Sequence, residues 1–111
     1  MTKDVERMAE QLVRLNACMK ELFDKGNVAL FTEMNAAIKE IHKIERAADS
    51  PAIRAVGVDL GIIYENFDMI IAVLRTTEDG VIDSAAQTAL NRLLHNIDLS
   101  VIKIAREFEM I

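Results

Sequence analysis

Residues 55–74 read AVGVDLGIIYENFDMIIAVL, and their apolar side chains fall on more than one side of a helix. On one side the apolar positions alternate three and four residues apart, which is the spacing of a helix face buried in a core. That stripe extends a little beyond the quoted stretch and comprises Ile53, Val56, Leu60, Ile63, Phe67, Ile70 and Leu74. We therefore predict one helix over residues 51–76, with Ser50 as its N-cap and Pro51 as its first residue.

Three further stretches carry the same periodicity. Apolar residues recur at helical spacing within residues 3–25, 28–49 and 84–110, which we predict as the other helices, the last of them with Ser84 as its N-cap. Amphipathic helices joined by short links pack as antiparallel neighbours. The sequence therefore predicts an all-α protein with a single domain over residues 1–111, folded as an antiparallel four-helix bundle of up-down-up-down topology.

A second apolar surface runs along the opposite side of the predicted third helix. Advancing about 100° per residue from Leu60 places a cluster of apolar side chains there. The cluster consists of Val58, Ile62, Met69 and Val73, with Tyr64 at its edge. A helix of a four-helix bundle needs only one buried face, so this surplus indicates a further contact.

Three explanations of the second surface are open. The helix lies centrally and is wrapped by the other three, or the surface is a subunit interface, or it lines a groove for an apolar ligand. We favour a two-fold homodimer with the cluster at its interface, because isologous dimers are the commonest soluble assemblies.

The charge pattern narrows the class of partner. The chain has 13 basic and 18 acidic residues, and no basic stripe of the kind that follows a nucleic-acid backbone. No uncharged run approaches the length of a membrane span, and the first residues, MTKDVERM, hold no apolar core of a secretion signal. A single cysteine, Cys18, suits a reducing compartment. We therefore expect a cytoplasmic protein that binds neither nucleic acid nor membrane.

His42 is the strongest candidate for chemistry. It lies off the core stripe, with Lys39 and Arg46 at helical-neighbour spacing. An accessible imidazole beside positive charge is what histidine phosphotransfer requires. Glu45, three residues after the histidine, would instead repel a phosphoryl group. Phosphotransfer through His42 is therefore kept as an alternative function.

No other arrangement of residues predicts a reaction. His95 has Asp98 three residues later, but two ligands do not make a metal site, and the core stripes contain no acidic residue. The sequence has no glycine-rich phosphate loop and no nucleophile elbow. We therefore predict no metal, no cofactor and no enzymatic activity. The favoured function is a small regulator or adaptor that binds protein partners and itself, and a carrier of an apolar ligand is the remaining alternative.

Overall fold

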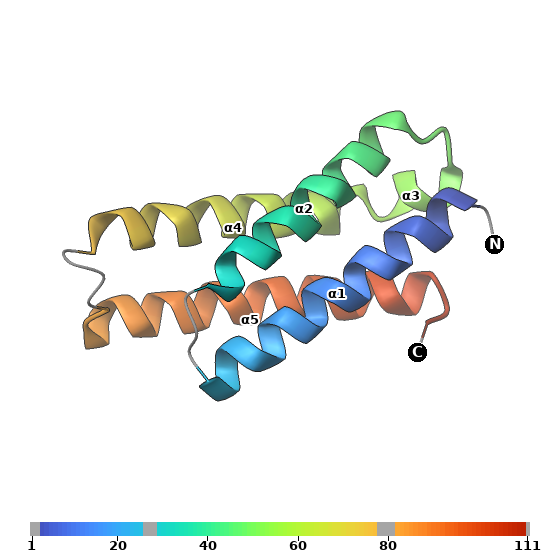
Figure 1. The fold of residues 1–111 in the computed structure, drawn as a ribbon. Coiled ribbons are helices and arrows are strands. Elements are labelled where there is room, and N and C mark those ends of the chain that lie inside the picture. Colours follow the sequence, from blue (N-terminus) through green and yellow to red (C-terminus); the bar gives the residue numbers. More distant parts are fainter. Residues whose placement is uncertain (1–2, 26–28, 78–81, 111) are drawn as a thin grey trace.

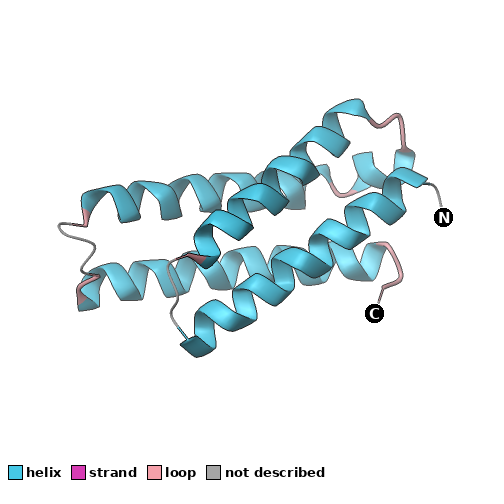
Figure 2. Ribbon diagram, in the orientation of Figure 1, coloured by secondary structure: helices cyan, strands magenta, loops and turns pink. Residues whose placement is uncertain are grey.

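The computed structural model of the chain describes residues 3–25, 29–77 and 82–110. Within these ranges every regular element is a helix and none is a strand (Figure 2). The predicted all-α class is therefore confirmed. The described residues form four long helices and a short one, in the order α1 (Lys3–Lys25), α2 (Leu30–Ala47), α3 (Pro51–Ala55), α4 (Gly57–Thr76) and α5 (Ser84–Glu107) (Figure 1).

One hydrophobic core lies among the four long helices, and it is built from the predicted stripes. Each long helix contributes side chains that are completely removed from solvent, such as Met8 of α1, Met34 of α2, Leu60 of α4 and Ile97 of α5. Burying a side chain of this size is worth about 1.5–3 kcal/mol. The periodic apolar residues thus account for both the helices and their packing.

The helices associate unequally. α1 packs along α2, α4 packs along α5, and α1 also meets α5, whereas α2 and α4 touch over only a short stretch. In Figure 1, α2 is steeply inclined to α4, and the two chain termini lie at the same end of an elongated molecule of 44 × 24 × 20 Å. The weak α2–α4 contact positions the candidate site described below.

The helix predicted over residues 51–76 is in fact two helices. The chain leaves helical geometry at Val56, whose φ of −103° and ψ of 12° separate α3 from α4. The N–H of Val56 still donates to the carbonyl of Ile53, and its own carbonyl accepts from Leu60, so the break leaves these backbone groups paired. A β-branched residue followed by Gly57 makes a weak point in a helix. The apolar spacing conceals this break because Val56 is itself buried.

The start of the third helical segment agrees with its prediction, but the start of the last does not. Ser50 caps α3, since its Oγ accepts the N–H of Ile53 at 3.4 Å, and Pro51 is the first helical residue. For α5 the predicted Ser84 cap is wrong. Asp83 occupies that position, and its Oδ1 accepts the N–H of Ala86 at 2.7 Å. Both residue types are good N-caps, and the carboxylate also suits the positive end of the helix.

Two helices end earlier than predicted. α2 stops at Ala47 because Ala48 is already extended, with ψ of 136°. α5 stops at Glu107, and Glu109 adopts a left-handed φ of 57°. The N–H of Met110 then donates to the carbonyl of Ala105 at 2.8 Å, which closes the helix end as a left-handed cap does. In the part of the chain that the structure describes, no helix is both long and apolar enough to cross a bilayer.

Candidate interaction surface

The outer side of α4 is open to solvent. Val58 is 80% exposed and Met69 is 51% exposed, while Ile62, one turn after Val58, is partly buried. The other helices therefore do not enclose α4, and the hypothesis of a helix wrapped on all sides is wrong. These three side chains share the outer side, as the helical spacing predicts.

The other two predicted surface residues turn toward the protein. Tyr64 and Val73 are partly buried and pack against the core. Tyr64 reaches α2, where its hydroxyl donates to Oε1 of Glu45 at 3.0 Å and its ring meets the ring of His42 edge-on at 5.0 Å between centroids. Burial, assisted by the negative charge of Glu45, raises the pKa of the Tyr64 phenol, which therefore stays protonated and able to donate.

A groove lies between α2 and α4 beside this tyrosine. Its volume is about 310 Å³, and its apolar lining includes Ile38, Phe67 and Ile71. Lys39 of α2 and Asp68 of α4 also line it, one from each helix. The groove exists because the two helices touch so little, and the face that contains it is called the α2–α4 face from here on.

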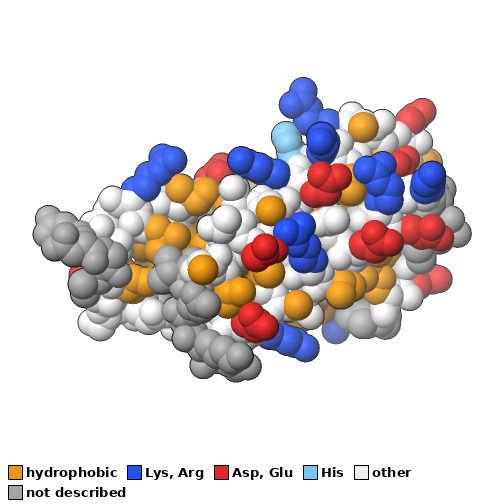
Figure 3. Space-filling model, viewed as in Figure 1, with side chains coloured by type: hydrophobic (Ala, Val, Ile, Leu, Met, Phe, Trp, Pro, Cys, Tyr) orange, Lys and Arg blue, Asp and Glu red, His pale blue; other side chains and the backbone are white. Residues whose placement is uncertain are grey.

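The two helices bring opposite charges to the α2–α4 face. α2 exposes Lys39, Lys43 and Arg46, and α4 exposes Glu65 and Asp68. None of these five side chains forms an ion pair with another described residue. Figure 3 shows Lys and Arg side chains around a histidine along the upper edge of the molecule. The charge on this face is therefore available to a partner.

His42 lies among the cations of α2. Its side chain is exposed, and it lines a shallow hollow of about 680 Å³ together with Lys39, Lys43 and Arg46. Glu45, which we expected from the sequence to repel a phosphoryl group, accepts a hydrogen bond from the hydroxyl of Tyr64. The hollow also includes Glu40, which lies 3.6 Å from Arg7, so the surroundings of His42 are three cations and one acid.

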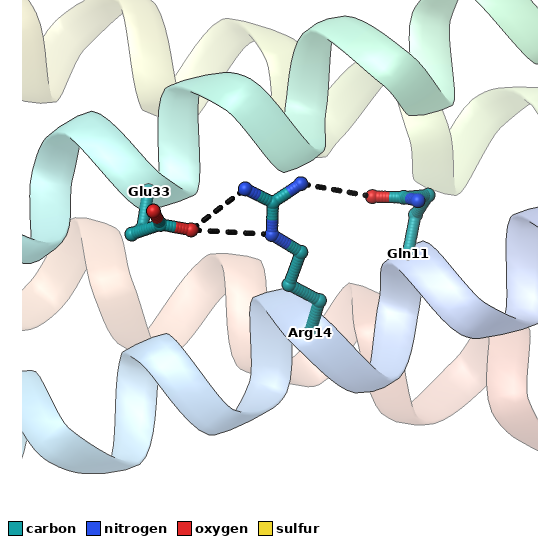
Figure 4. Close-up of polar contacts among 3 residues, drawn as sticks. All are labelled: Gln11, Arg14 and Glu33. Atoms are coloured by element: carbon teal, nitrogen blue, oxygen red, sulfur yellow. Dashed lines mark hydrogen bonds and ion pairs between the residues drawn. The ribbon is translucent and has the colours of Figure 1, made fainter.

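Another part of α2 satisfies its charge within the chain. Figure 4 shows Arg14 of α1 reaching Glu33 of α2, with Nε and Nη2 donating to Oε2 at 3.2 and 2.6 Å. Nη1 of Arg14 also donates to Gln11 at 3.5 Å. The hydrogen bond to Glu33 raises the pKa of Arg14. Arg14 and Glu33 therefore neutralise each other within the chain, whereas the cations of the α2–α4 face have no ion-pair partner among the described residues.

A second apolar hollow lies between α1 and α5, on a different part of the surface. It has a volume of about 210 Å³, and only uncharged residues line it, among them Leu12, Val13, Ile102 and Met110. Val13 is 59% exposed. Sequence reasoning missed this hollow because Val13 and Ile102 are each a single apolar departure from a core stripe. A carrier of an apolar ligand would use this hollow.

The other candidate reactive residues, His95 and Cys18, do not form a site together. His95 is exposed, and Cys18 is buried, which raises the pKa of its thiol. Among the described residues no three His, Cys, Asp or Glu side chains are placed to hold a metal ion together. Comparisons with protein-family models, with curated proteins and with solved structures find no match for the chain.

Proposed function

We propose that the chain is a non-enzymatic protein–protein interaction module, a small cytoplasmic regulator or adaptor, that self-associates through the outer side of α4. Its scaffold in this proposal is an antiparallel four-helix bundle with up-down-up-down topology, in which α3 is a short insertion before α4. Two chain termini at one end of the molecule agree with an even number of alternating long helices.

The observation that carries the proposal is the exposure of Val58 and Met69 on one side of one helix. Exposed apolar side chains that share a helix side mark interaction surfaces more often than isolated ones do. A two-fold dimer would bury both residues from each subunit, at about 1.5–3 kcal/mol for each fully exposed side chain. This gain is of the same order as the cost of association, so polar contacts around the patch should contribute as well.

Substitution by aspartate tests the proposed surface. We expect Val58→Asp and Met69→Asp to convert a dimer into a folded monomer, because each would place a charge in the interface without a partner. Val13→Asp is the matched control, since Val13 is comparably exposed but lies in the α1–α5 hollow. Size-exclusion chromatography with light scattering gives the mass, and circular dichroism checks the fold. Dissociation by Val13→Asp alone would move the interface to α1 and α5 and contradict the proposal.

Histidine phosphotransfer through His42 is a second candidate function. The observation in its favour is an exposed imidazole that shares a hollow with three cations and one acid, Glu40. Such cations would stabilise a phosphoryl group. Incubation with a small-molecule phosphodonor, followed by mass spectrometry, tests it. An acid-labile phosphate lost in His42→Ala and retained in His95→Ala would establish phosphotransfer at this site, and an unmodified chain would exclude it for that donor.

A further inference from the structure

We propose that the surface covering the outer side of α4 is the basic face of α2 from a second copy of the chain, so that each subunit contributes both halves of the contact. The two-fold axis runs along the groove between α2 and α4. This inference rests on the proposed self-association and specifies its geometry, because it pairs α4 with α2 of the partner instead of with α4.

The charges of the α2–α4 face carry the first step. Lys39 on α2 and Asp68 on α4 line one groove. Lys43 and Arg46 lie further along α2, and Glu65 lies one turn before Asp68 on α4; these five side chains are exposed and without ion pairs among the described residues. Arg75, also exposed, lies two turns after Asp68 in the last turn of α4. A face with one positive and one negative half is complementary to its own copy only in particular orientations. Electrostatic complementarity of this kind selects the orientation and the partner.

Symmetry decides which orientation is allowed. A two-fold axis that lies in the interface and crosses the groove at a right angle would stack α2 on α2 and α4 on α4, which places like charges opposite each other. An axis in the interface that runs along the groove stacks α2 of one subunit on α4 of the other, twice. Only the second arrangement brings the basic half against the acidic half at both contacts.

The register along the helices follows from contacts within one chain. Lys39 and Asp68 line the same groove, so they lie at about the same height along the molecule. A two-fold axis along the groove leaves this height unchanged, and therefore sets Lys39 opposite Asp68 of the partner. The rings of His42 and Tyr64 are in contact, so these two residues also lie at one height. Lys43 and Glu65 are the next residues in the sequence, and the same operation therefore brings Lys43 close to Glu65 of the partner.

Small residues leave room for the partner helix. A methyl group added at Gly61 would have no atom within 4 Å, so nothing in the described part of the chain fills the space above this exposed glycine. On α2, Ala36 and Ala47 are exposed just before and just after the three cations. Glycine inside an exposed helix is unfavourable relative to alanine, and close approach of another helix is a use for it.

A charge-swap experiment tests the pairing. One variant carries Lys39→Glu and Lys43→Glu, and the other carries Glu65→Lys and Asp68→Lys. In either variant alone both halves of the face have the same sign, so we expect the dimer dissociation constant to rise roughly tenfold or more. In an equimolar mixture each altered half meets an opposite charge on the other variant, and we expect a heterodimer with the mass of the wild-type dimer. Light scattering behind a sizing column measures the masses.

A matched variant separates pairing from net charge. Lys20→Glu with Arg106→Glu changes the net charge as much as the double lysine reversal, but at exposed positions on α1 and α5. We expect it to remain a dimer, and its dissociation would overturn the inference.

The other possible outcomes distinguish failure of the α2–α4 pairing from failure of the proposed self-association. If the wild type is a dimer and both charge variants remain dimers, the α2–α4 pairing is wrong while self-association stands. A dimer lost only with the α4 reversal would indicate that α4 packs on α4, and would also overturn the pairing. Failure of the mixture to form heterodimers after each variant has dissociated contradicts it as well. If the wild type is a monomer, both proposals fail together.

Discussion

The two flanks of α4 differ in how completely the chain itself uses them. On one flank α4 packs along α5, where Nδ2 of Asn96 donates to Oδ1 of Asn66 at 3.1 Å, across a part-buried seam. On the other flank α2 makes a short contact through Tyr64 and then leaves a groove with unpaired charge on both sides. The same helix thus packs closely against α5 on one flank and leaves a groove beside α2 on the other, and the proposed partner would bind at that groove.

The connection between α2 and α4 suits this difference. Ala48 is extended, Ser50 and Pro51 start a new short helix, and the chain changes direction again at Val56 before α4 begins. With α3 between them, α2 and α4 are not joined by a direct turn, and nothing local forces them together along their length. The exposed charges on the separated surfaces stay hydrated, so they carry no desolvation penalty in the single chain.

The largest expected effect comes from the buried side of α4. Ile63 is fully buried, so Ile63→Ala removes apolar contacts and leaves a cavity, and we expect a loss of about 2–5 kcal/mol in the free energy of unfolding. Met69→Ala on the open side should change the stability of the monomer by less than about 0.5 kcal/mol. Urea titration at concentrations where the dimer has dissociated measures both. Equal losses would show that the outer side of α4 is also covered within the chain.

The next effect tests the short contact between α2 and α4. Tyr64→Phe keeps the ring but removes the hydrogen bond to Glu45, and we expect a loss of about 0.5–1.5 kcal/mol at neutral pH. Because the folded state raises the pKa of this phenol, the wild type should lose further stability as the pH rises above about 10, where the phenol of the unfolded chain ionises. The Phe variant lacks this titration, so its stability should fall less steeply. Parallel alkaline losses would contradict the buried phenol.

The smallest effect concerns the glycines of α4. We expect Gly61→Ala to stabilise the monomer by about 0.5–1 kcal/mol, because the added methyl group meets open space and favours the helix. Gly57→Ala is the control, since Gly57 is the first residue of α4 and gains less from helix propensity. Thermal denaturation of the monomer compares the two. Destabilisation by Gly61→Ala would mean that a neighbouring group already occupies the space above it.

The core was predictable from sequence because it depends on local periodicity. Leu60, Ile63 and their counterparts in the other stripes recur at helical spacing, and a helix that must bury one face buries those positions. The break at Val56 and the left-handed end at Glu109 were not predictable in this way, since each depends on a single backbone angle that the apolar pattern does not record. The cap at Asp83 was missed because the adjacent Ser84 is an equally good candidate.

The candidate surface was predictable only in part. An ideal helix places Val58, Ile62 and Met69 on the side away from the core, and the structure agrees for these residues. It does not say which neighbour covers each flank, so Tyr64 and Val73 were assigned to the surface although they pack inward. Lys39 and Arg46 were recognised as neighbours of His42, but their place beside α4 was not, because sequence periodicity does not reveal which helix lies beside the open side of α4.

The most direct test of self-association is the mass of the wild-type chain at equilibrium. Sedimentation equilibrium across concentrations up to tens of micromolar, at low and at high salt, measures it without any substitution. We predict a transition toward twice the 12.4 kDa of one chain, with the midpoint moving to higher protein concentration at high salt because screening weakens the charge pairs. A mass of one chain at every concentration and salt would contradict the account.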